Sequence, residues 1–396
     1  MGCTRGGGLL VWEVMMRHVL LGSAILLTGA SVFTAVKAPT VGTWMLAVLV
    51  GEYGHFLVVL PLGVAGWTLV RGAGGQEGFY AATLALCAMA AVFMLKPSMQ
   101  ARAVAHALPE RLEKAFGKAA VERDTFSVAG FFAGVDVVEP EARVFAHAGT
   151  GEALVLDFYR AQGRVTPAPC VIVIHGGGWD GGDRSQLAGL NSLLAGRGYA
   201  VTAVSYRLAP KHRWPAQRED VRTALAYLKT HAAELGIDAS RFVLLGRSAG
   251  GQVAEGVAYD QPDAAVRGVI ALYAPADLEF AWSHTPERDV LDSKKLMRQL
   301  TGGTPETSAE NFRSGSPYLH VKRGAVPTLL MHGTIDSLVW RRQSERMAEK
   351  LYAENVPCVF LELPWATHAF DFNLHGPGGQ LSTFAIEWFL AAVTRE

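Results

Sequence analysis

Three long apolar runs near the N-terminus place the strongest constraint on how this 396-residue chain can fold. Residues 19–36 and 78–95 contain no charged side chain, and residues 41–70 contain only one, Glu52. A helix of about 20 apolar residues crosses a bilayer core of roughly 30 Å, and runs without a polar face cannot cover the surface of a soluble domain. We therefore expect a membrane region over residues 1–96, with helices at about 19–36, 41–70 and 78–95, rather than a group of buried core helices.

The first run has a second interpretation, as a signal peptide. Arg17 and His18 precede its apolar core, and residues 28–30 offer small side chains for cleavage. A retained first helix gives three membrane spans, and a cleaved one gives two. The lysine and arginine residues that flank three spans favour a C-terminal domain on the cytoplasmic side, whereas cleavage favours the opposite side. We expect a multi-pass protein of the inner, or cytoplasmic, membrane, with the side of its C-terminal domain left open.

Glu52 and His55 form an ionisable pair inside the second apolar run. They are three residues apart and so share one face of a helix. An ionisable pair within a membrane helix is a candidate functional site. The alternative is structural, with the pair facing the other two helices or marking a kink near Gly51 and Gly54. We favour the structural interpretation.

The rest of the chain has a different pattern. Residues 97–134 form a polar connector with helical character, and residues 135–396 are long enough for one soluble domain. Apolar strand-like segments alternate there with segments of helical periodicity, and they cover residues 153–158, 170–174, 200–205, 242–245, 268–273, 328–331 and 358–363. This alternation predicts an α/β fold with a mainly parallel sheet flanked by helices, preceded by two or three transmembrane helices. Residues 283–321 are irregular and predict a lid insertion over the site.

Charge and cysteine usage exclude two classes of function. The formal net charge is +0, and there is no basic patch of the kind that binds nucleic acid. The four cysteines have no C-x-x-C spacing that would predict a metal site. We expect neither a metal nor another cofactor.

The pentapeptide at residues 246–250 has the pattern G-x-S-x-G and contains Ser248. It follows the apolar strand at 242–245 and precedes the helical segment at 251–258. A serine at so tight a strand-to-helix turn presents its hydroxyl outside the fold, at the positive end of the helix. Ser248 is therefore the candidate nucleophile.

Glycines follow the strand at 170–174, in the sequence His175, Gly176, Gly177, Gly178 and Trp179. Three consecutive glycines cost backbone entropy and need a reason. One reason is that glycines expose backbone N–H groups, which can bind a developing oxyanion. The alternative is an ordinary glycine-rich turn, and we favour the first interpretation.

Two later loops complete a candidate triad. Asp336 lies just beyond the strand at 328–331, where a carboxylate can orient a histidine. Asp277 is a competing acid, but it stands earlier in the chain than the expected order allows. His368 follows the strand at 358–363, which gives the order serine, aspartate, histidine.

Together these motifs resemble the α/β-hydrolase fold, and within it the hormone-sensitive-lipase-like family and related carboxylesterases. The resemblance extends from about residue 153 to the C-terminus and includes Leu156–Arg160, Ser205–Pro210 and Trp214–Ala216. The sequence departs from the family pattern at Trp179, where phenylalanine is frequent, and at Gln252, where asparagine is common.

The resemblance implies a role for each matching residue. Ser248 would be the nucleophile, His368 would take up and return its proton, and Asp336 would orient His368. The oxyanion hole would consist of the N–H groups of Gly177, Gly178 and Ala249, supported by His175 and Gly176. We expect the substrate pocket to include Trp179, Phe280 and Trp282.

The leading hypothesis is a membrane-anchored serine hydrolase that cleaves small carboxylic esters through an acyl-enzyme, with the lipid bilayer as its other partner. An amidase, formamidase or peptidase could use the same triad, because amides and esters both pass through a tetrahedral oxyanion. A third possibility is a membrane scaffold in which the C-terminal domain has no catalytic role.

Overall fold

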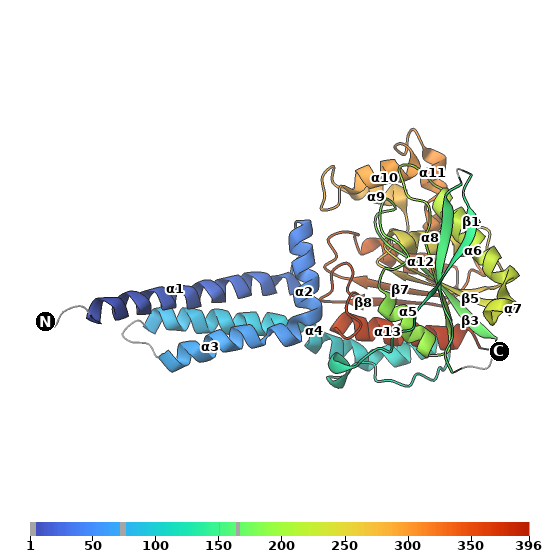
Figure 1. The fold of residues 1–396 in the computed structure, drawn as a ribbon. Helices are drawn as coiled ribbons and strands as arrows, with labels where there is room; N and C mark the ends of the chain where they lie inside the picture. The colour runs from blue at the N-terminus through green and yellow to red at the C-terminus, as the bar shows by residue number, and fades with distance from the viewer. Residues whose placement is uncertain (1–4, 72–76, 150, 164–166, 396) are drawn as a thin grey trace.

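The computed structural model describes residues 5–71, 77–149, 151–163 and 167–395. Residues 1–4 and 72–76 of the expected membrane region lie outside this part of the chain. Figure 1 shows an elongated bundle of helices at one end of the molecule and an α/β domain at the other. Helix α2 (Val41–Leu57) lies where the two parts meet.

The α/β domain is built on one eight-stranded sheet with the order β1-β2-β4-β3-β5-β6-β7-β8. Its strands are β1 (Glu141–His147), β2 (Ala153–Tyr159), β3 (Ala168–Ile174), β4 (Ala200–Val204), β5 (Ile237–Arg247), β6 (Val266–Leu272), β7 (Thr328–Gly333) and β8 (Cys358–Leu363). β2 runs antiparallel to both β1 and β4, and the other neighbours are parallel. The predicted α/β class with a mainly parallel sheet is confirmed.

Helices cover both faces of the sheet. Val171 and Val173 of β3 pack with α5 (Ala188–Gly196), α13 (Pro377–Val393) and the second half of α4 (Glu77–Phe116). Ile172 faces the other core, which includes α6 (Ala216–Thr230), α8 (Ala249–Tyr259) and α12 (Arg342–Ala353). The alternation along β3 follows from the two-residue period of a strand. A parallel sheet covered in this way gathers its functional loops at the carboxyl ends of its strands.

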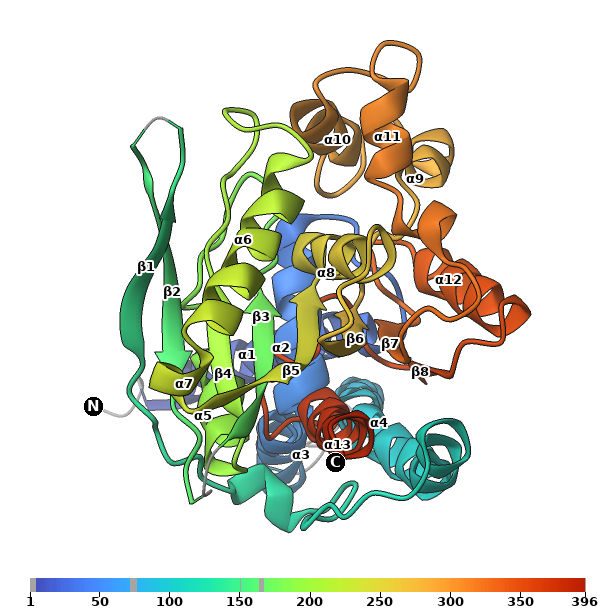
Figure 2. The same cartoon turned by 90° about the vertical axis from the view of Figure 1, so that its right-hand side faces the viewer.

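The expected insertion at 283–321 forms most of a helical cap. The cap consists of α9 (Leu278–His284), α10 (Ser293–Thr301), α11 (Ala309–Ser314) and the short helix η3 (Pro317–His320). Figure 2 shows α9, α10 and α11 gathered above α8, away from the sheet. The remaining short helices of the domain are α7 (Ala232–Leu235) and η2 (Ala129–Phe132).

The helical bundle contains segments that fit a membrane. Helix α1 (Arg5–Ser31) leads into η1 (Val32–Thr34), and α3 (Val59–Arg71) and the first half of α4 pack beside α1. By length and composition, Val11–Thr34 and Glu77–Phe116 can each cross a membrane. The bent pair α2 and α3 would make a third span. The coarse expectation of two or three apolar helices is therefore met.

The apolar run at 41–70 is not the single helix that we expect from its sequence. It divides near Val58 into α2 and α3, which meet at 54°. Pro61 lacks the N–H that would bond to the carbonyl of Leu57 four residues earlier, so an unbroken helix cannot pass this point without strain. The bend turns α2 away from the bundle and towards the α/β domain.

Helix α4 is continuous through the expected start of the connector. It runs for 40 residues and contains Pro97 in its interior. Pro97 leaves the carbonyl of Phe93 without its usual intrahelical donor, and the hydroxyl of Thr34 donates to that carbonyl at 3.0 Å. The ammonium of Lys96 in turn donates to the carbonyl of Thr34 at 2.9 Å. These two bonds fasten the end of η1 to α4 and stabilise the helix across its proline.

Candidate active site

Ser248 occupies a strained turn between β5 and α8. Its backbone has φ 52° and ψ −123°, a conformation that L-residues rarely adopt. Its N–H donates to the carbonyl of Leu272 at 2.9 Å, which ties the turn to the neighbouring strand β6. A side chain at position 246 would lie 2.2 Å from the carbonyl oxygen of Gly250, so only glycine fits there. The turn therefore has the geometry that the G-x-S-x-G motif predicts.

Asp336 and His368 meet across the ends of β7 and β8. Nδ1 of His368 lies 2.7 Å from Oδ2 of Asp336. The other oxygen, Oδ1, accepts the N–H groups of Leu338 and Val339 at 2.8 and 2.9 Å. Because both carboxylate oxygens have partners, Asp336 is held in one orientation. An imidazole that donates from Nδ1 to this carboxylate keeps Nε2 free as a base.

His332 is a further contact of the same carboxylate that sequence reasoning missed. Its Nε2 lies 3.2 Å from Oδ2 of Asp336, and both side chains are completely buried. Burial alone would raise the pKa of Asp336, but the charge of His368 and hydrogen bonds from His332 and His368 outweigh it. They hold the pKa well below its usual range. The available signal was a histidine four residues before Asp336, at the end of the same strand.

Asp277, the competing acid, has its oxygens engaged elsewhere. Oδ1 caps α9 by accepting the N–H of Phe280 at 2.9 Å. Oδ2 forms an ion pair with Arg346 of α12 at 2.9 Å. A capping residue of this kind stabilises the start of a helix. Of the two candidate acids, the structure brings Asp336 to His368.

The glycine loop lies beside the serine. Gly177 and Gly178 both have positive φ, 123° and 61°. A Cβ at position 177 would lie 2.3 Å from the carbonyl oxygen of Gly181. Gly176 donates its N–H to Oε1 of Gln186 at 2.9 Å, which orients the start of the loop. Gly178 and Ala249 border the same cavity as Ser248. Backbone N–H groups on such a loop and at the start of α8 can stabilise negative charge near the serine.

His175 and Trp179 fix the two ends of the glycine loop. The ring of His175 is stacked on Tyr206, with centroids 4.2 Å apart and planes at 7°. The hydroxyl of Tyr206 donates to the carbonyl of His175 at 3.1 Å. The indole N–H of Trp179 donates to Oε1 of Gln252 on α8 at 2.9 Å. The unusual pair Trp179 and Gln252 therefore forms a direct link between the loop and the helix that follows the serine.

A buried ion pair lies behind the serine turn. Arg247 and Asp371 are each 2% exposed, and Nε of Arg247 lies 2.5 Å from Oδ2 of Asp371. Oδ1 of Asp371 accepts the hydroxyl of Tyr273 at 2.5 Å. The ring of Tyr273 lies against His368, with centroids 4.2 Å apart. This group connects the residue before Ser248 to the loop that carries His368.

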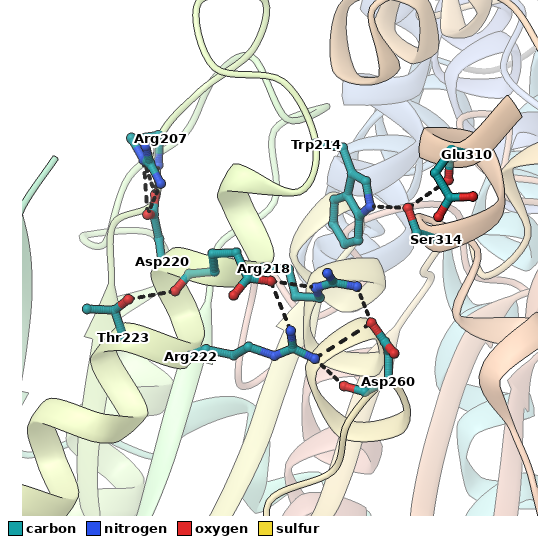
Figure 3. Close-up of polar contacts among 10 residues, drawn as sticks. Arg207, Trp214, Arg218, Asp220, Arg222, Thr223, Asp260, Glu310 and Ser314 are labelled. Atoms are coloured by element: carbon teal, nitrogen blue, oxygen red, sulfur yellow. Dashed lines mark hydrogen bonds and ion pairs between the residues drawn. The ribbon is translucent and has the colours of Figure 1, made fainter. Parts of the chain in front are cut away.

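Polar contacts around α6 brace the outer side of the domain (Figure 3). Arg207 follows β4 and forms an ion pair with Asp220 of α6 at 2.7 Å. The indole of Trp214 donates to the hydroxyl of Ser314 in the cap at 3.1 Å. The segments 205–210 and 214–216 thus attach the cap and α6 to the sheet.

A cavity of about 470 Å³ opens beside Ser248. Trp179 borders it, as expected, together with Leu296 and Met297 of the cap. Phe280 and Trp282, which we expected in the pocket, are absent from the cavity wall as far as the described residues define it. Phe280 stacks on Trp340, which itself borders the cavity, and Trp282 packs against Phe312. The sequence shows that aromatic residues lie near the site, but it does not show whether their side chains face the cavity.

Two residues of the N-terminal region also border this cavity. Lys37 and Ala38 lie between η1 and α2, and both contribute to the wall. Ala38 is only 2% exposed. The cavity is therefore bounded partly by the segment that connects the apolar helices.

The described residues contain no group of three histidine, cysteine, aspartate or glutamate side chains that could hold a metal ion. This arrangement suits nucleophilic chemistry, because it holds a serine hydroxyl on a tight turn, a histidine oriented by a carboxylate, and backbone N–H groups on a neighbouring loop.

Comparisons with known proteins find esterases. A family model described as BD-FAE matches residues 156–351. Esterase LipC of Mycobacterium tuberculosis is 34% identical over 266 residues, which cover 62% of this chain and 64% of LipC. The probable carboxylic ester hydrolase LipM of the same organism is 30% identical over 275 residues, which cover 63% of this chain and 62% of LipM. The chain thus spans a little under two thirds of the length of these relatives.

Solved structures show the same fold. Carboxyl esterase 2 of the fungus Tuber melanosporum matches with a TM-score of 0.56 and 21% identity, over 66% of this chain and 89% of that one. Thermogutta terrifontis esterase 2, phosphonylated by sarin, matches with a TM-score of 0.51 and 25% identity. The match covers 60% of this chain and 87% of that esterase.

Proposed function

We propose that this chain, which is similar to esterases of the α/β-hydrolase fold over about 60% of its length, is a membrane-anchored serine hydrolase of carboxylic esters. One observation carries the proposal. The carboxylate of Asp336 contacts Nδ1 of His368 at 2.7 Å, in the domain that also presents Ser248 on a strained turn beside a cavity. An oriented base and a hydroxyl that a substrate can reach are what acyl transfer requires.

In the proposed reaction, His368 takes the proton from the hydroxyl of Ser248 as its oxygen attacks the ester carbonyl. The resulting oxyanion accepts hydrogen bonds from the N–H groups of Gly177, Gly178 and Ala249. The intermediate then collapses, and His368 returns the proton to the departing alcohol, which leaves an acyl group on Ser248. A water molecule gives its proton to His368 and attacks the acyl group. The acid leaves, and the proton returns to Ser248.

Ester hydrolysis is favoured over amide hydrolysis by the relatives, since LipC is named an esterase and LipM a carboxylic ester hydrolase. The triad alone does not make this choice. A matched ester and amide with the same acyl group separates the two reactions. Faster turnover of the amide would replace the proposal with an amidase or peptidase.

Membrane anchoring is supported by the apolar helices of the N-terminal region. Lys37 and Ala38 border the cavity, which supports a reaction close to the segment that connects the first two apolar helices. We expect the protein to remain with membranes after a high-salt wash and to require detergent for release. Labelling of intact cells with an impermeant phosphonate probe, compared with lysate, reports the side on which Ser248 lies.

The central test replaces Ser248 with alanine. We expect this change to abolish both hydrolysis of a short p-nitrophenyl ester and labelling by a fluorophosphonate. Ser283→Ala is the matched control, because Ser283 lies in α9 of the cap and is exposed. Undiminished hydrolysis by the Ser248 variant would contradict the proposal. A wild-type protein that never labels would favour the scaffold alternative.

A further inference from the structure

The loop that carries His368 is held by the N-terminal region. This histidine loop, residues 364–376, connects β8 to α13. Helix α2 precedes it in sequence by more than 300 residues, yet contacts it at several points. The position of the proposed base therefore depends on a helix outside the α/β domain.

Glu52 of α2 connects the two ends of the histidine loop. Its Oε1 accepts the indole N–H of Trp365 at 3.4 Å, near the beginning of the loop. Its Oε2 accepts the N–H of Gly378 at 2.8 Å, in the first turn of α13 just after the loop. The free N–H groups and positive dipole end of a helix stabilise a carboxylate. Glu52 is only 1% exposed, and each of its two side-chain oxygens has an N–H donor. Burying these oxygens without donors would be costly.

Two more bonds reach the middle of the loop. The indole N–H of Trp44 donates to the carbonyl of His368 itself at 3.1 Å. The side-chain amide of Asn373 donates to the backbone carbonyl of Glu52 at 3.1 Å. With the two carboxylate bonds, α2 contacts the start, the middle and the end of the histidine loop.

The sequence around the start of α13 leaves space for this contact. A Cβ at position 376 would lie 2.4 Å from Oε2 of Glu52, and one at position 378 would lie 2.8 Å from Oε1. Both residues are glycine. The Gly376-Pro377-Gly378 segment therefore permits the carboxylate to approach the helix end closely.

His55 does not share this contact, although it lies three residues from Glu52. Its ring stacks on Phe131, with centroids 3.6 Å apart and planes at 11°. The expectation that the pair faces the other helices of the bundle is therefore wrong for both residues. His55 packs against η2, and Glu52 reaches the histidine loop.

We propose that Glu52 and Trp44 are positioning residues for His368, so that the apolar N-terminal region is part of the catalytic apparatus as well as an anchor. The inference rests on the proposed roles of Ser248, Asp336 and His368. Neither residue need touch substrate. They set where the imidazole lies relative to Ser248, and a displacement of about 1 Å in a catalytic group can lower turnover about a hundredfold.

Glu52→Gln and Trp44→Phe test the proposal in the full-length protein. Glutamine keeps the size of glutamate, but its NH₂ group cannot accept a hydrogen bond. It must therefore face the N–H of either Trp365 or Gly378, and one of the two contacts is lost. His55→Ala is the control on the same helix. Trp67→Phe is the control for the indole, because Trp67 lies in α3 and is 49% exposed. Each variant is purified in detergent, its active sites are titrated with a fluorophosphonate, and kcat and KM are measured for a short p-nitrophenyl ester.

We expect Glu52→Gln to lower kcat per titrated site by roughly ten- to a hundredfold and Trp44→Phe by about fivefold, with KM little changed and both controls unaffected. A merely structural role would reduce the number of titrated sites and leave kcat per site as in the wild type, which would overturn the proposal. If Glu52→Gln yields no titratable protein, the value of kcat per titrated site in Trp44→Phe decides between a positioning role and a merely structural one. Failure of the wild-type protein to label would instead refute the proposed esterase function.

Discussion

His332 donates a hydrogen bond to Asp336, with Nε2 3.2 Å from Oδ2. The same Nε2 lies 3.0 Å from the carbonyl of Val339. Both neighbours can only accept, so Nε2 carries the proton. Nδ1 lies 2.7 Å from the hydroxyl oxygen of Ser344. His332 is thus held as a donor towards the carboxylate that orients His368.

We predict that His332→Phe lowers kcat for a short ester by about tenfold, because Asp336 loses a buried donor. KM should change little, since His332 is not in the cavity wall that the described residues form. Ser344→Ala should have a smaller effect in the same direction. His231→Phe, at the end of α6, is the control. A normal kcat for His332→Phe would show that the backbone donors suffice to hold Asp336.

The low pKa of Asp336 predicts a pH dependence of stability. Because its folded pKa lies below the ordinary value of 3.8, the ionised carboxylate stabilises the fold above that pH. This contribution is lost as pH falls further. The difference in thermal midpoint between wild type and Asp336→Asn should be larger at about pH 5 than at about pH 3. A difference that grows on acidification would contradict the assignment.

Gly177→Ala should lower kcat by about a hundredfold or more, because the new methyl group would meet the carbonyl oxygen of Gly181 and displace the oxyanion loop. Gly324→Ala is a matched control. Gly324 also has positive φ, 85°, but nothing lies within 4 Å of a Cβ there. That control should lose some stability through backbone strain and keep its kcat. Equal kcat values for the two variants would argue against an oxyanion role.

Leu296 should limit the length of the acyl group. It borders the cavity, and its Cδ1 would lie 3.0 Å from a Cβ on Gly178. Leu296→Ala should raise kcat/KM for a hexanoate ester relative to an acetate ester by about tenfold, since each buried CH₂ contributes roughly 0.8 kcal/mol. Leu319→Ala is the control, because Leu319 lies in η3 and its side chain is exposed. An unchanged preference would place the acyl group in another part of the cavity.

Asp371→Ala should destabilise the fold by about 3–5 kcal/mol, because it leaves the buried guanidinium of Arg247 without its carboxylate. Chemical denaturation in detergent measures this loss. Lys211→Ala removes an ion pair with Glu152 at the surface and should change the midpoint little. A small effect of Asp371→Ala would mean that water replaces the carboxylate.

The local sequence was sufficient to predict much of the α/β domain. Strand periodicity predicted the sheet, and the order of the reactive residues predicted which loops would meet at its edge. Asp336 and His368 indeed lie 2.7 Å apart. These inferences succeeded because each depends on a short segment and on the general rule that parallel strands gather their carboxyl ends.

Contacts between distant segments could not be predicted in this way. Glu52 and Trp365 are separated by 313 residues, and no periodicity in either segment indicates their meeting. Phe280 and Trp282 were expected in the pocket because they are aromatic and close in sequence to the lid, but the direction of each side chain depends on how α9 packs. The bend at Val58 had a local cause in Pro61, which the apolar composition of the run concealed.

Helix α4 gives the two parts of the molecule a common backbone. It runs for 40 residues, or about 60 Å, and its second half buries Leu108 and Leu112 completely in the core beneath the sheet. Under the proposed membrane anchoring, this continuous helix would join the α/β domain to the bilayer directly, without a flexible linker. Proteolytic cleavage within the second half of α4 would remove side chains from the core of the α/β domain. Under the same proposal, a substrate would reach the cavity beside Ser248 within a thin layer above the lipid surface.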